Sequence, residues 1–120
     1  MTKTEQFVSY SLQDRDLAHL AHWKTTSYAE HKALGEFYDR LLDLIDGFVE
    51  QYQGYYGKRM SIEREEHTTT MAIDQHLELS IEWIEKNRYE ICDRDETPLQ
   101  NTIDEIVRLY QHTQYMLTLE

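Results

Sequence analysis

Apolar residues recur every three or four positions along most of this chain, a spacing typical of amphipathic helices. The clearest run lies within residues 27–53, and shorter runs of the same period predict helices at about 12–24, 71–92 and 98–119. In the longest run the apolar face comprises Tyr38, Leu41, Leu42, Ile45, Phe48, Val49 and Tyr52. The pattern therefore predicts four helices and little else.

Breaking residues are scarce and support the same division. The chain has four glycines and one proline, and Pro98 follows Thr97 where the last helix is expected to begin. Residues 77–83 alternate apolar and polar like a strand, but the length of the segment and its flanking helix formers favour a helix. With residues 58–70 as a connection between two helical hairpins, we expect an all-α four-helix bundle with a crossover, forming a single domain over 1–120.

Charge and cysteine content limit the function classes. The chain carries 23 Asp and Glu against 12 Lys and Arg, a net charge of −11, which argues against direct binding to DNA or to anionic lipid. Its single cysteine, Cys92, cannot form an intramolecular disulfide or a cysteine-rich zinc site, and we expect it to be a structural thiol. Because there is no secretory leader and no membrane-spanning apolar run, we expect a cytoplasmic protein without a membrane partner.

Four residues form a candidate metal-ligand set: His22, His31, Asp46 and Glu50. Imidazole and carboxylate groups are ligands for iron, manganese and zinc. Asp46 and Glu50 are one helical turn apart beside the apolar stripe, but the 15 residues from His31 to Asp46 span about 22 Å of helix. One chain therefore cannot bring both ends to one ion, whereas two antiparallel copies related by a two-fold axis can.

These residues carry a family resemblance. His22-Trp23, then His31, then Asp46-x-x-x-Glu50 resembles the iron-oxidising segment of the Dps-type mini-ferritins, the starvation-induced iron cages of bacteria. The resemblance covers about the first half of the chain and implies a ferritin-like bundle. It also implies that iron is bound by His22 and His31 of one subunit with Asp46 and Glu50 of another, and is oxidised by peroxide or dioxygen. The implied assembly is a homo-oligomer, a two-fold dimer at least and a dodecameric cage in the typical family member.

The sequence departs from that family in several ways. Gly35 stands where the family has a further aspartate ligand, the loop between Trp23 and His31 is short, and the lysine-rich amino-terminal arm that binds DNA is absent. Short, divergent relatives of this kind occur in tailed bacteriophages, so a phage origin and an infected bacterial cell fit the sequence.

Two alternatives come from other classes. A small, acidic helical protein can bind and inhibit a host protein by imitating the charge of DNA, and a ferritin-like scaffold can persist after losing its metal. Among the remaining candidates, His19 is a possible substitute ligand, and we expect His67, His76 and His112 to be surface groups. Trp23, Trp83 and the tyrosines are expected to pack in the core or at an interface.

Overall fold

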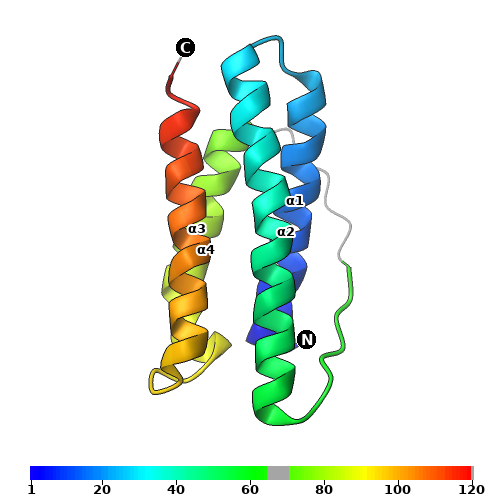
Figure 1. The fold of residues 1–120 in the computed structure, drawn as a ribbon, viewed down its shortest axis with the longest axis vertical. Coiled ribbons are helices and arrows are strands. Elements are labelled where there is room, and N and C mark those ends of the chain that lie inside the picture. The colour runs from blue at the N-terminus through cyan, green and yellow to red at the C-terminus, as the bar shows by residue number, and fades with distance from the viewer. Residues whose placement is uncertain (65–70, 120) are drawn as a thin grey trace.

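The computed structural model describes residues 1–64 and 71–119. Four α-helices make up this part of the chain: α1 (Lys3–Lys24), α2 (Tyr28–Tyr56), α3 (Ile73–Ile91) and α4 (Thr97–Met116) (Figure 1). The described residues contain no strand, so the alternating segment 77–83 is helical. The predicted all-α four-helix bundle is confirmed.

The helices form two antiparallel hairpins, α1–α2 and α3–α4, whose turns lie at opposite ends of the bundle (Figure 1). Helix α1 packs on α2 and α3, and α4 packs on the same two helices, so α1 and α4 lie diagonally across the bundle. Helix α3 begins toward the end of the bundle opposite to where α2 finishes, so the connection between the hairpins is a crossover (Figure 1). One long crossover is the connectivity of ferritin-like bundles.

Helix α1 begins nine residues earlier than predicted, at Lys3 rather than about residue 12. Thr2 caps it: the Thr2 hydroxyl accepts from the Glu5 N–H, and the Glu5 carboxylate accepts from the Thr2 N–H, which together form a capping box. The apolar period did not reveal these turns because much of the buried face of α1 is small or polar, namely Thr4, Ser9, Ser11, Asp14 and Ala18. The hydroxyl of Thr4, for example, donates to the Ile91 carbonyl.

The other helix ends lie close to their predicted positions. Ser27 caps α2, its hydroxyl accepting from the Glu30 N–H. At the other end α2 extends to Tyr56, three residues beyond the prediction, and stops at Gly57, whose left-handed φ of 68° suits glycine. Helix α3 is shorter than the predicted 71–92 at both ends. Helix α4 begins one residue before the predicted 98–119 and ends three residues earlier.

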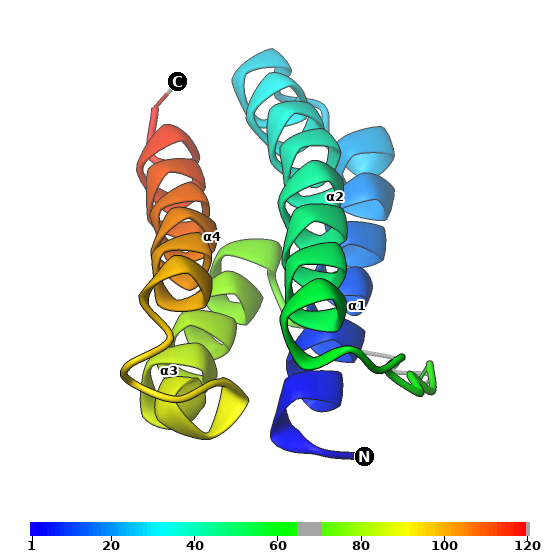
Figure 2. The ribbon, with the colours of Figure 1, turned by 60° about the horizontal axis from the view of Figure 1, so that its bottom comes forward.

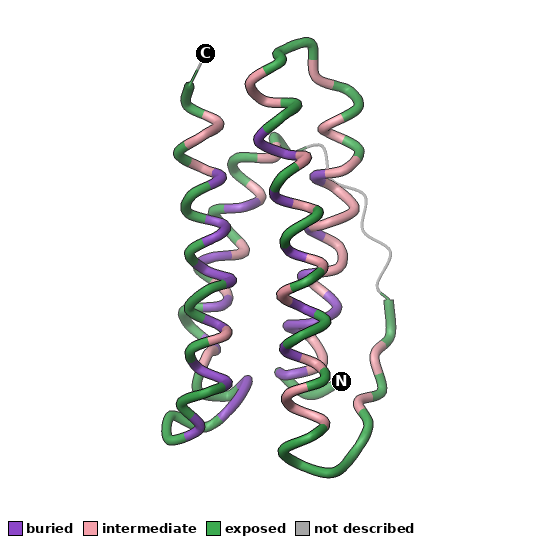
Figure 3. Tube along the Cα trace, in the orientation of Figure 1, coloured by how far each residue is buried: buried purple, intermediate pink, exposed green. Residues whose placement is uncertain are grey.

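The core lies between all four helices, and buried positions alternate with exposed ones along each of them (Figure 3). The Phe7 ring packs edge-on against Phe48, joining α1 to α2, and Phe37 packs edge-on against Tyr110, joining α2 to α4. In α3, Leu77, Ile81 and Ile84 are buried while Leu79 is exposed. This three- and four-residue spacing explains why the segment is a helix despite its alternating sequence.

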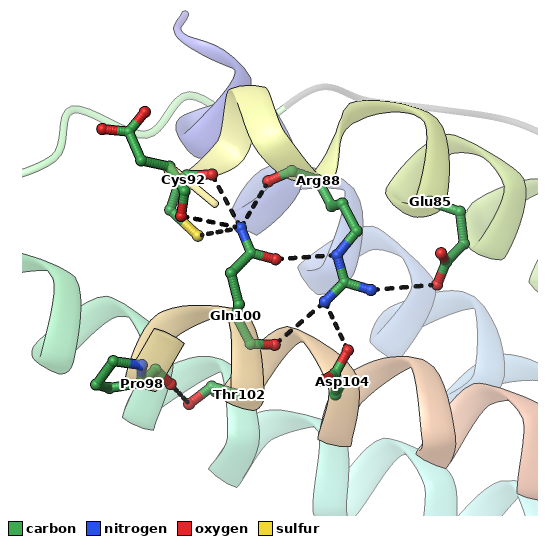
Figure 4. A network of polar contacts seen from close by, with 8 residues as sticks. Glu85, Arg88, Cys92, Pro98, Gln100, Thr102 and Asp104 are labelled. Carbon is green, nitrogen blue, oxygen red and sulfur yellow. Dashed lines mark hydrogen bonds and ion pairs between the residues drawn. The ribbon is translucent and has the colours of Figure 1, made fainter. Parts of the chain in front are cut away.

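A polar network joins α3 to α4 beneath this core (Figure 4). The Arg88 guanidinium donates to the Gln100 side-chain oxygen at 2.9 Å and to the Asp104 carboxylate at 2.5 Å. The Gln100 amide nitrogen donates in turn to the Cys92 carbonyl and to its Sγ. Cys92 is buried, and burial raises the pKa of its thiol to about 11, which disfavours the reactive thiolate.

Candidate functional site

His22 and His31 lie face to face where α1 ends and α2 begins. The His22 Nδ1 is 2.5 Å from the His31 carbonyl oxygen, and the His31 Nδ1 is 2.8 Å from the His22 carbonyl oxygen. Their rings stack with centroids 3.7 Å apart and planes 16° from parallel. Each histidine therefore fixes the ring of the other, and the pair closes the turn of the first hairpin.

This pairing determines the tautomer of both rings. A backbone carbonyl only accepts hydrogen bonds, so each Nδ1 must carry the proton and donate it. In the neutral rings both Nε2 atoms then hold a free lone pair, and neither has a hydrogen-bond partner among the described residues. An imidazole that donates from Nδ1 to a carbonyl and binds through Nε2 is the common arrangement of histidine ligands to metals.

Gly35 is in direct contact with this pair. A Cβ atom at position 35 would lie 3.0 Å from Cε1 and 3.2 Å from Nδ1 of His22, closer than ordinary carbon contacts. The absence of a side chain thus lets the His22 ring lie against α2. An aspartate here, as in the mini-ferritins, would require His22 to move, so Gly35 and the histidine pair are structurally linked.

An aromatic cluster flanks the pair on α1 and α2. The His19 ring stacks on Tyr38 with centroids 4.1 Å apart, and it lies 4.1 Å from the Trp23 ring. His19 is therefore held between two aromatic rings. Trp23 itself is 67% exposed, so it is not part of the core of this chain. His22 and His31 line a shallow depression of about 520 Å³, together with Tyr28, Lys32, Gly35, Glu36, Tyr38 and Asp39.

Asp46 and Glu50 lie elsewhere on α2. Both are exposed, and neither forms a hydrogen bond or an ion pair with any residue in the described parts of the chain. Because α2 is one continuous helix, its rise of about 1.5 Å per residue separates them from His31 by about 22 Å or more. The structure thus brings His22 and His31 together and leaves the two carboxylates apart from them. Within residues 1–64 and 71–119, no group of three or more His, Cys, Asp or Glu side chains is placed to hold a metal ion.

A buried polar cluster was missed at the sequence level. His76 was expected at the surface, but its Nε2 lies 2.6 Å from Oδ1 of Asp14, whose other oxygen accepts from the Tyr110 hydroxyl at 2.5 Å. Asp14 is 2% exposed. The hydrogen bond to Asp14 raises the pKa of His76, and burial, with Asp14 beside it, raises that of Tyr110. No local signal could reveal the cluster, because its members come from α1, α3 and α4.

The remaining histidines and aromatic residues separate into two groups. His112 is exposed, as expected, and His67 lies outside the described residues. Trp83 is half-buried and packs edge-on against Tyr10, with ring centroids 5.0 Å apart, so it belongs to the packing between α1 and α3. None of the described helices is long and apolar enough to span a membrane.

Sequence comparison finds a family of unknown function and a phage protein that are similar to this chain. The family of unknown function DUF5856 matches residues 22–117. A protein of Enterobacteria phage T4, described as an uncharacterized 14.6 kDa protein in the mobD-ri intergenic region, is 32% identical over 124 residues. That match covers 99% of this chain and 91% of the T4 protein. No solved structure matches the chain.

Proposed function

This chain belongs to the family of unknown function DUF5856. We propose that it binds ferrous iron at a site shared between two copies and oxidises it, as a Dps-like mini-ferritin does. In this proposal His22 and His31 of one copy face Asp46 and Glu50 of another. Iron is the substrate and cargo. The similarity to a phage T4 protein supports action in the cytoplasm of an infected bacterium.

The observation that carries the proposal is the reciprocal hydrogen bonding of the histidine pair. It holds both rings at the protein surface with Nδ1 protonated and Nε2 free. The Nε2 atoms are therefore the positions at which the pair could bind an ion. The depression in front of the pair leaves room for an ion and for the side chains of a second copy.

Asp46 and Glu50 supply the complementary half. Their carboxylates are exposed, unpaired within the described residues, and on the same helix as His31. Two α2 helices packed antiparallel across a two-fold axis would bring the carboxylates of one copy to the histidines of the other at both ends of the interface, since a two-fold interface repeats each contact. Such a pair of copies has two equivalent sites.

The chemistry follows from this ligand set. Two carboxylates and two neutral imidazoles suit iron, and carboxylates favour the ferric product because of its higher charge. Each Fe(II) ion loses one electron, and one hydrogen peroxide molecule takes up two electrons and two protons to form two water molecules. The net charge of −11 draws ferrous ions toward the protein. Oxidation needs only the dimer, whereas mineral storage needs a closed cage.

The direct test removes the carboxylates without disturbing the histidine pair. Purified protein given Fe(II) and peroxide is expected to develop ferric absorbance, and the Asp46→Asn/Glu50→Gln variant is expected to lose the protein-dependent rate. A matched control, Glu82→Gln/Glu90→Gln, removes the same charge from exposed positions on α3. Equal rates for the two double variants would contradict the shared site. A dimer that oxidises no iron would indicate a ferritin-like scaffold without metal chemistry.

A further inference from the structure

A cavity of about 370 Å³ lies between α2 and α4, and it adjoins the depression at the histidine pair through Glu36. This volume falls within the range of small-molecule sites, roughly 300–1,000 Å³. Its floor includes Phe37 from α2 and Leu109 from α4, both buried. Charged side chains stand at its rim, so the cavity combines an apolar floor with polar groups that could orient a ligand.

The two ends of this cavity differ in chemistry. The residues that line it run from Ala33 to Arg40 on α2 and from Glu105 to Met116 on α4. Because α2 and α4 are antiparallel neighbours (Figure 2), Arg40 lies toward the same end as Glu105, and Ala33 lies toward the same end as Met116. One end therefore carries charged side chains, and the other is lined by Ala33 and Met116 with the polar His112 and Thr113 beside them.

Two arginines distinguish the charged end. Arg40 on α2 and Arg108 on α4 form no ion pair and no hydrogen bond with any described residue, although Glu36 and Glu105 line the same cavity. Guanidinium groups bind carboxylates with paired hydrogen bonds. The two glutamates nearby disfavour a doubly charged anion such as a phosphate monoester more strongly than a singly charged one.

We propose that this cavity binds an alkyl carboxylate of medium chain length. Arg40 and Arg108 hold the carboxylate, and the alkyl chain lies over Phe37 and Leu109 toward Met116. The head group of the ligand carries a single negative charge, because the carboxylates of Glu36 and Glu105 repel additional negative charge. The tail is an unbranched alkyl chain that fits between the two helices. The site shares no proposed ligand with the iron centre, so either proposal can fail without the other.

The test uses sodium decanoate titrated into the full-length protein by calorimetry. We expect saturable binding that weakens by about tenfold or more in Arg40→Gln/Arg108→Gln. The control Lys58→Gln/Lys86→Gln removes the same charge from exposed positions away from the cavity and should bind decanoate like the parent. Equal affinity in both double variants, or no binding to the parent, overturns the proposal.

Two further probes test the head and the tail separately. Decyltrimethylammonium, with the same chain and the opposite charge, should bind about tenfold or more weakly, and so should butyrate, which lacks most of the chain. Should the arginine variant fail to fold, methyl NMR of the parent protein decides. Decanoate should shift the Leu109 and Met116 methyl signals and leave exposed Leu79 unchanged. Shifts confined to other residues, or equal binding of the cationic probe, overturn the assignment.

Discussion

The His76 imidazole lies 2.6 Å from the carboxylate of Asp14, a residue 62 positions earlier in the chain, and the Tyr110 hydroxyl donates to the same carboxylate. Three helices thus meet at one buried acid. Burying a carboxylate is costly unless its oxygens are satisfied, and here each oxygen has a donor. The cluster therefore fixes the position of α1 against the second hairpin.

Removing the acid should be severely destabilising. In Asp14→Ala both His76 and Tyr110 lose their acceptor inside the bundle, and breaking a buried pair in this way typically costs about 3–5 kcal/mol. We expect a fall of that size in the free energy of unfolding, measured by urea titration. Asp43→Ala, an exposed change on α2, is the control and should alter stability by less than about 0.5 kcal/mol. An equal loss of unfolding free energy in Asp14→Ala and Asp43→Ala would show that the buried cluster does not stabilise the fold.

The same contact predicts a pH dependence of stability. The hydrogen bond to Asp14 raises the pKa of folded His76 above the 6.5 expected in the unfolded chain. The stabilisation from protonated His76 is therefore complete below pH 6.5 and is lost as the pH rises through the higher, folded value. The stability difference between the parent and His76→Gln should shrink over that interval. A difference that grows with pH would contradict the pairing.

Two helical glycines should respond oppositely to alanine. At Gly47 a Cβ atom meets nothing within 4 Å, so Gly47→Ala should gain helix propensity and stabilise by about 0.5–1 kcal/mol. At Gly35 the new Cβ would press on a His22 ring whose Nδ1 is held by the His31 carbonyl. We expect Gly35→Ala to lose that gain and to shift the His22 ring signals in NMR spectra. Equal stabilisation by Gly35→Ala and Gly47→Ala would contradict this, because it would show that the His22 ring can move away from the new Cβ atom at no cost.

The extended first helix gives a further prediction. Thr2→Ala removes the hydroxyl that accepts from the Glu5 N–H, and N-cap losses cost about 1 kcal/mol. Hydrogen exchange should accelerate in the first turns of α1 and remain unchanged in α4. Thr26→Ala, which removes an exposed hydroxyl between α1 and α2, serves as the control. Equal exchange rates in the first turns of α1 in the parent and in Thr2→Ala would contradict the capping box.

The parts of the fold predicted from sequence are those where packing follows a local period. Helix α2 carries a continuous apolar stripe, and Pro98 begins α4 within a residue of its expected start. The first turns of α1 escaped prediction because hydroxyl groups on Thr4 and Ser9 bond to backbone carbonyls of distant segments, which leaves no apolar period. Such contacts exist only once the bundle has formed.

The candidate site also has a part that sequence spacing predicts and a part that depends on the folded structure. His22 and His31 were selected by spacing, yet their stacking and reciprocal hydrogen bonds depend on the turn between α1 and α2. The contact between Gly35 and His22 likewise arises only in the folded hairpin, because sequence alone presents this glycine only as a missing ligand. His76 was misassigned to the surface because its partner Asp14 lies on another helix.

The shared site is tested most directly by mixing two inactive variants. His31→Ala lacks one of the two histidines at each site, and Asp46→Asn/Glu50→Gln lacks both carboxylates. In a mixed dimer one of the two sites has every ligand and the other keeps only His22. After unfolding and refolding together, random pairing should restore about a quarter of the parental rate of ferric absorbance. Recovery near that level supports iron oxidation between subunits, whereas a mixture as inactive as its components, from a parent that does oxidise iron, would contradict it.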